Sequence, residues 1–104
     1  MKNIIILCTI NDIDKAKEIS KSLLEKHLIA CSNIVQNITS LYHWEGKICE
    51  DKEYLMILKS RSDLFEEVKS HIADLHPYEV PEIISLEIAD GSKSYLDWLN
   101  TELK

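Results

Sequence analysis

The distribution of apolar and polar positions along the chain predicts alternating strands and helices. The run Asn3–Thr9 is apolar at nearly every position and rich in isoleucine, which is typical of a central strand buried on both faces. Asn11 or Asp12 can cap a helix that follows and ends near residues 27–28. The apolar face expected for this helix consists of Ile13, Ala16, Ile19, Leu23 and Leu24.

Two strands and a second helix are expected next. Residues 29–44 favour a strand, and a bulge or bend near Asn33–Asn37 accounts for their imperfect alternation. Glu45-Gly46 can turn the chain into another strand over residues 47–59. Ser60, followed by Asp63, resembles the capping box of a second helix that Pro77 ends. The apolar positions of this helix are Phe65, Val68, Ile72 and Leu75.

The last part of the chain predicts a strand over residues 82–90, with Ile84, Leu86 and Ile88 on one face. A short terminal helix follows in SYLDWLNTELK. Its inward positions are expected to be Tyr95, Leu96, Leu99 and Leu103.

The order β-α-β-β-α-β plus a terminal helix predicts an α+β fold, the ferredoxin-like arrangement with an antiparallel sheet and helices on one face. The first strand is then central. Its end at Cys8 should lie near His76, where the second helix finishes, and near Glu82, where the last strand begins. Cys31 and Lys59 belong to the opposite end and could reach this site only from another subunit.

Both faces of the predicted sheet need to be covered. Residues 4–7 and 54–58 are apolar at consecutive positions, whereas alternation with polar residues is expected when one face meets water. We therefore expect the face without helices to be buried in an oligomer.

Composition and charge exclude several classes of function. The 104 residues are expected to form one domain, residues 1–104, and their net charge of −6 disfavours nucleic acid and anionic membranes as partners. Arg61 is the only arginine, which disfavours phosphate capture as the main activity. No window approaches a membrane span, and the apolar run Ile4–Cys8 is too short for a signal peptide. Three cysteines without CxxC spacing favour free thiols in a reducing cytoplasm.

The segment HPYEVPEI, residues 76–83, is the strongest candidate for chemistry. Its two prolines stiffen a connector that carries His76, Tyr78 and Glu82, although the prolines can also serve only to separate a helix from a strand. A thiolate from Cys8 and an imidazole from His76 would suit copper or zinc. The alternative for Cys8 is a packing role in the core. Nothing supplies the third group of a Cys-His catalytic site, so we do not expect an enzyme.

Trp44 has two interpretations. It can be a packing anchor, since tryptophan is favoured at interfaces, or it can form the wall of a pocket beside HPYEVPEI. Glu82 and Lys59 can similarly form a buried charge pair, bind a ligand or remain exposed.

The segments LCTINDIDKA, LIACSNI, SLYHWEGKI, MILKS, HPYEVPEI and SYLDWL, in this order and spacing, resemble the divalent-cation-tolerance protein CutA family. The resemblance covers essentially the whole chain. It implies a ferredoxin-like subunit in a tight homotrimer similar in architecture to PII signalling proteins. It also implies a cytoplasmic protein that binds copper or other divalent cations in connection with metal tolerance.

The resemblance also assigns residues to a metal site. Cys8 and His76 match family positions proposed to bind copper, and Leu75 stands where some relatives carry another histidine. Cys31 matches a cysteine of the family, and His71 could replace another metal-associated thiol.

A second set of residues, Trp44, Lys59, Tyr78 and Glu82, matches the family's pocket-forming pattern. In one alternative, these residues bind a small anionic or nucleotide ligand between the subunits of a PII-like signalling trimer. In another, the trimer anchors partner proteins and its affinity for metal is incidental.

Overall fold

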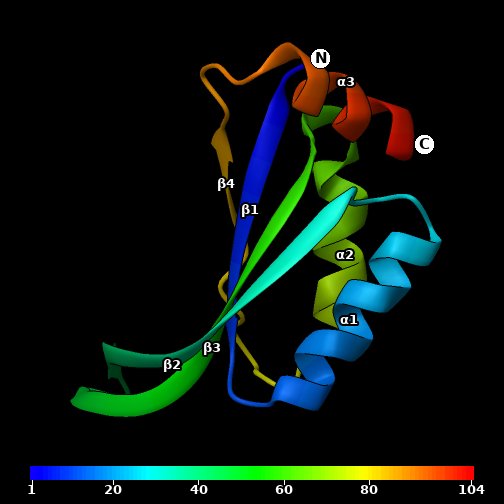
Figure 1. The fold of residues 1–104 in the computed structure, drawn as a ribbon. Helices are drawn as coiled ribbons and strands as arrows, with labels where there is room; N and C mark the ends of the chain where they lie inside the picture. The colour runs from blue at the N-terminus through cyan, green and yellow to red at the C-terminus, as the bar shows by residue number, and fades with distance from the viewer.

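The computed structural model describes all 104 residues as a four-stranded antiparallel sheet with two long helices packed on one face (Figure 1). The elements are β1 (Asn3–Ile10), α1 (Ile13–Glu25), β2 (Cys31–Trp44), β3 (Lys47–Arg61), the 3₁₀ turn η1 (Ser62–Leu64), α2 (Phe65–Leu75), β4 (Ile84–Glu87) and α3 (Lys93–Glu102). The strand order is β2-β3-β1-β4, which confirms the predicted ferredoxin-like fold and the central place of the first strand. None of the helices is long and apolar enough to cross a membrane.

Strand β1 has one side facing the helices and one side facing away from them. Along β1, fully packed residues alternate with partly exposed ones, because successive side chains of a strand point to opposite faces. The side packed against α1 and α2 is formed by Ile4, Ile6, Cys8 and Ile10, none more than 3% exposed. The sequence predicts burial of β1 on both faces. Within a single chain, only the face toward the helices is buried.

The face of the sheet without helices is apolar. Register places Leu7 between Ile57 of β3 and Ile84 of β4, and it places Ile5 beside Leu86. Ile84 and Leu86 are about half exposed, at 49% and 51%. We call this surface the open face; its apolar residues are Ile5, Leu7, Val35, Leu55, Ile57, Ile84 and Leu86.

Helix α1 starts at the predicted cap. The Asp12 carboxylate accepts hydrogen bonds from the backbone N–H groups of Asp14 and Lys15, at 2.9 and 3.1 Å, which satisfies two free donors of the first turn. The residues that α1 buries most are Ala16, Ile19 and Leu23. Leu24, expected on the same face, is 38% exposed because it lies at the margin of the apolar stripe.

The β2–β3 hairpin is bent where the sequence predicts a bulge. Register shifts between Val35 and Ile38, and Asn37 adopts a left-handed conformation with φ of 60°. Glu45 and Gly46, with φ of 49° and 75°, form the predicted turn. Beyond the bulge both strands curve away from the helix layer, as the lower part of Figure 1 shows.

The predicted capping role of Ser60 is wrong. Ser60 is still part of β3, fully buried, and its hydroxyl donates to the Leu28 carbonyl oxygen at 2.7 Å. The η1 turn follows, and α2 starts only at Phe65, without a side-chain cap. Helix α2 ends at Leu75 as expected, because Pro77 disfavours a helical conformation at the residue before it.

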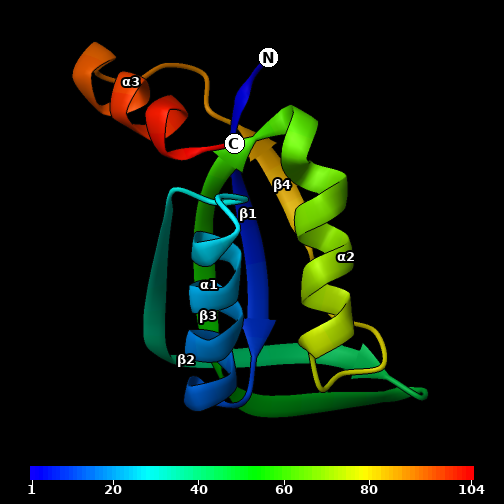
Figure 2. The same ribbon diagram turned by 90° about the vertical axis from the view of Figure 1, so that its right-hand side faces the viewer.

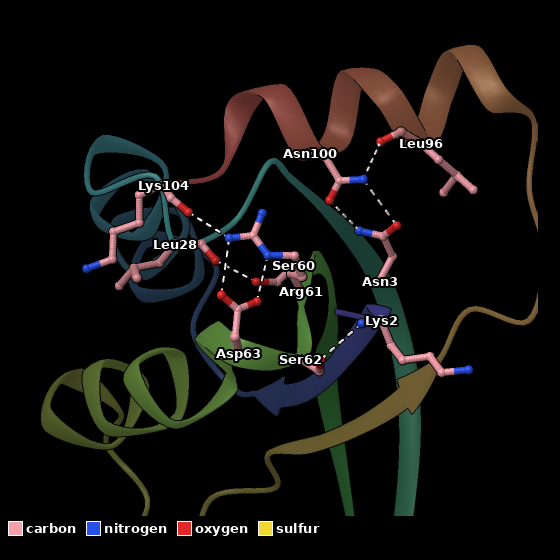
Figure 3. A network of polar contacts seen from close by, with 10 residues as sticks. All are labelled: Lys2, Asn3, Leu28, Ser60, Arg61, Ser62, Asp63, Leu96, Asn100 and Lys104. Carbon is pink, nitrogen blue, oxygen red and sulfur yellow. Dashed lines mark hydrogen bonds and ion pairs between the residues drawn. The ribbon is translucent and has the colours of Figure 1, made fainter.

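The end of the sheet next to α3 is held by a polar network (Figure 3). Arg61 donates to both carboxylate oxygens of Asp63, at 2.6 and 3.2 Å, and to the Lys104 carbonyl oxygen at 2.7 Å. Asn100 of α3 exchanges hydrogen bonds with Asn3 at the start of β1. The only arginine of the chain thus links the end of β3 to the C-terminal residue.

The C-terminal elements differ from the prediction in extent and orientation. Strand β4 pairs with β1 over only four residues, Ile84–Glu87, instead of the whole segment 82–90. In α3, Leu99 is fully buried, whereas Tyr95 is 40% exposed and therefore does not face inward. Figure 2 shows that α3 lies across the end of the sheet rather than beside α1 and α2. Leu99, together with Leu103 just after the helix, belongs to the main hydrophobic core.

Candidate functional site

Cys8 and His76 meet at one backbone carbonyl group. The Thr9 carbonyl oxygen accepts a hydrogen bond from His76 Nε2 at 2.8 Å and a longer one from Cys8 Sγ at 3.8 Å. His76 is only 8% exposed, because it caps the C-terminal end of α2 beside the end of β1. The predicted proximity of the two residues, 68 positions apart in sequence, is therefore correct.

The hydrogen bonds of His76 determine its tautomer. A carbonyl oxygen can only accept, so Nε2 carries the proton that is donated to Thr9. Nδ1 then accepts from the backbone N–H of Tyr78 at 3.1 Å. The ring is neutral in this arrangement and both of its nitrogens are engaged, so it ties β1 to the connector after α2.

Cys8 is a protonated thiol at neutral pH. Burial, the largest cause, together with the negative charges of Glu82 and Glu53, raises the pKa of Cys8 from 9.0 to about 12. Its side chain lies on the helix side of β1 and is fully buried.

We expect Cys8 to resist alkylation in the native protein. Treatment with iodoacetamide at pH 8 should modify Cys8 only after denaturation, because the reactive thiolate is nearly absent and the sulfur is inaccessible. Cys49, which is partly exposed, is the internal control. Peptide mass spectrometry with and without guanidinium measures both sites. Equal native labelling of Cys8 and Cys49 would contradict this assignment.

The other two candidate metal residues lie elsewhere in the chain. His71 Nε2 is hydrogen-bonded to Ser22 Oγ at 2.8 Å and links α2 to α1. Cys31 begins β2 opposite Lys59, at the far end of the sheet. No three His, Cys, Asp or Glu side chains are grouped so that they could hold a metal ion. A single chain therefore brings together only Cys8 and His76 of the four candidates.

A pocket of about 420 Å³ opens beside this pair, between the end of β1, the bent hairpin and the connector from α2 to β4. We call it the hairpin pocket; its lining residues are Thr9, Tyr42, His43, Trp44, Glu53, Tyr78, Glu79, Val80 and Glu82. The lining thus includes Trp44, Tyr78 and Glu82, three of the four residues predicted to form a pocket.

Lys59, the fourth predicted pocket residue, lies outside the hairpin pocket, and its ammonium group donates to Asn33 Oδ1. No lysine or arginine of the same chain lines the pocket, whereas three carboxylates do. The charge of the lining therefore does not favour a small anionic ligand.

Of the lining residues that the sequence analysis does not single out, Glu53 is the buried one. It lies in the polar stretch KICEDKEY, which reads as an exposed arm, yet it is only 7% exposed. Its Oε2 accepts a hydrogen bond from Tyr78 Oη at 2.6 Å. Burial, followed by this hydrogen bond and the Glu53 charge, raises the pKa of Tyr78. The available signal is the bulge, which bends the hairpin and sets Glu53 opposite the apolar Ile38.

These features define a ferredoxin-like domain with an apolar open face and an acidic, aromatic pocket at one end of its sheet. The sequence profile of the family described as CutA1 divalent ion tolerance protein matches residues 4–102. The chain belongs to this family, which associates it with tolerance to divalent cations.

Curated proteins and solved structures agree with this membership. The divalent-cation tolerance protein CutA of Pyrococcus horikoshii is 48% identical over 101 residues, which is 97% of this chain and 98% of that protein. The structure of the divalent cation tolerance protein from Thermus thermophilus superimposes with a TM-score of 0.95, at 41% identity, over 98% of this chain and 99% of that one. A relative from Archaeoglobus fulgidus, described as periplasmic divalent cation tolerance protein CutA, has a TM-score of 0.94 and 39% identity over 98% and 99% of the two chains.

Proposed function

We propose that this protein acts in divalent-cation tolerance as a cytoplasmic homotrimer that binds copper or another divalent cation and catalyses no reaction. The observation that carries the proposal is the family match over residues 4–102, which associates almost the whole chain with divalent cations. The net charge of −6 supports the exclusion of nucleic acid and anionic membranes as partners. This function is compatible with an additional small-molecule ligand or partner protein of the trimer.

The open face supports assembly into an oligomer. It consists of aliphatic side chains from three adjacent strands around Leu7 and Ile57, with Val35 of β2 beside them. A contiguous apolar surface on a sheet is typical of a protein interface, since covering it removes apolar area from water. A second layer supplied by neighbouring copies would complete the sheet sandwich that the single chain lacks.

Cys8 and His76, as they lie in the chain, do not form a ready copper site. A metal ion bound to Cys8 must displace the proton of a thiol whose pKa is about 12. A metal ion bound to His76 Nδ1 must displace the Tyr78 N–H. Leu75, where relatives can carry another histidine, packs against the hydrophobic core and offers no ligand. Binding at this pair therefore requires a local rearrangement and further ligands from water or a second subunit.

The metal proposal is tested by titrating Zn²⁺ and Cu²⁺ into the reduced protein in a calorimeter. If Cys8 and His76 are ligands, Cys8→Ala and His76→Gln should each weaken binding by about tenfold or more, and affinity should fall on acidification because protons compete for both groups. The matched controls, Cys49→Ala and His27→Gln, should bind as the wild type does, because both residues lie outside the pocket beside Cys8 and His76. Unchanged affinity in both Cys8→Ala and His76→Gln would remove the metal role from this pair.

A further inference from the structure

The hairpin pocket contains a buried carboxylate without a cation. Glu53 is 7% exposed, and its one hydrogen bond is the one that Oε2 accepts from the uncharged Tyr78 hydroxyl. None of the six ion pairs of the chain includes Glu53, Glu79 or Glu82. A buried carboxylate is costly unless a positive charge or several donors compensate it. The chain itself therefore supplies no positive charge to the Glu53 carboxylate.

The distribution of the acidic groups argues against a single metal ion as the missing charge. Glu53 is buried, whereas Glu79 and Glu82 are exposed on the connector between α2 and β4. These carboxylates and His43 all line the pocket, yet no three of them converge in a way that could hold a metal ion. One buried carboxylate and two carboxylates at the rim instead suit a ligand that carries two positive charges apart from each other.

Aromatic side chains form much of the remaining wall. Tyr42, Trp44 and Tyr78 line the pocket, and aromatic rings attract organic cations through their electron-rich faces. Both tyrosine hydroxyls are already engaged, that of Tyr42 with Asp51 and that of Tyr78 with Glu53. The volume, about 420 Å³, is within the range of pockets for small organic ligands.

We propose that the hairpin pocket binds an extended organic diammonium ion. One ammonium group of the ligand pairs with the buried Glu53 carboxylate, and the second pairs with Glu82 or Glu79 at the rim. The intervening methylene groups lie along Trp44 and Val80. This site needs neither Cys8 nor His76 as a ligand, so its failure would leave the copper proposal untouched.

The test is calorimetric titration of 1,5-diaminopentane into the full-length protein in a buffer of low ionic strength. We expect one binding event per chain, weakened by added salt, and no binding of the uncharged pentane-1,5-diol or of glutarate. Glu53→Gln should weaken binding at least tenfold, because the amide keeps an acceptor for Tyr78 and removes the charge. Glu25→Gln makes the same change of charge at an exposed position of α1 and should have no effect.

Tryptophan fluorescence locates the bound diamine. In Trp98→Phe, where Trp44 is the only tryptophan, 1,5-diaminopentane should change the emission, and in Trp44→Phe it should not. Absence of binding by the wild type, or equal affinity in Glu53→Gln and Glu25→Gln, would overturn the proposal. Binding of 1,5-diaminopentane by Lys59→Ala but not by the wild type would also overturn it. Lys59 of a neighbouring copy would then be the cation that occupies the pocket in the wild type.

Discussion

Replacing Ile57 by glutamate should convert the proposed homotrimer into 12 kDa monomers. Ile57 is at the middle of the open face, opposite Leu7, so the new carboxylate would be buried against a neighbouring subunit without a partner. An uncompensated buried charge costs about 3–5 kcal/mol, which raises the dissociation constant about 100-fold or more at each interface. Light scattering at micromolar protein concentration measures the mass of the wild type and of the variant.

Leu24→Glu is the matched control for this experiment, because Leu24 is a partly exposed leucine of α1 on the opposite layer of the molecule. It should leave the mass of the assembly unchanged. Leu86→Glu, on the half-exposed strand β4, provides a second disruption of the open face that does not depend on the folding of Ile57→Glu. A wild-type protein that is already a monomer would refute both the assembly and the role of the open face.

His76→Ala should cause a large loss of stability, about 2–4 kcal/mol, with a decrease in Tm on the order of 10 °C. The substitution removes the donor to the Thr9 carbonyl oxygen and the acceptor of the Tyr78 N–H, and it leaves a gap where an 8% exposed ring had been. Denaturation followed by circular dichroism, at equal subunit concentration for all variants, measures the effect.

Two further histidine variants separate the hydrogen bonds from a general effect of substitution. His76→Gln should recover part of the stability, since its amide can donate to Thr9 as the imidazole does. His43→Ala, at an exposed position, should stay within about 0.5 kcal/mol of the wild type. If His76→Ala were as stable as His43→Ala, the imidazole would not be the link between β1 and the connector.

Local signals were enough to predict most elements of this fold. The acceptor at Asp12, the left-handed residues Asn37 and Gly46, and the proline after α2 act through their own backbone neighbours, so each is readable from a few positions. The error at Ser60 has the same origin. Its spacing to Asp63 suits a helix cap, but its hydroxyl bonds to Leu28, 32 positions away.

The candidate site was only partly predictable. Strand order alone brings Cys8 to His76, because the end of a central strand must meet the end of the helix that packs on it. The contact between Tyr78 and Glu53 has no counterpart in the periodicity of either segment. It depends on how far the hairpin bends, which is a property of packing and not of local sequence.

The sequence by itself determined the order of the elements, the central strand, the bulged hairpin and the stiff connector HPYEVPEI, because periodicity and turn chemistry act over short distances. Only the tertiary structure decided what the polar groups do. It engages both nitrogens of His76, keeps Cys8 protonated, places Lys59 away from the pocket and buries Glu53 without a cation. The physical reason is that burial and hydrogen-bond partners depend on segments that are distant in sequence and meet only when the sheet and helices pack.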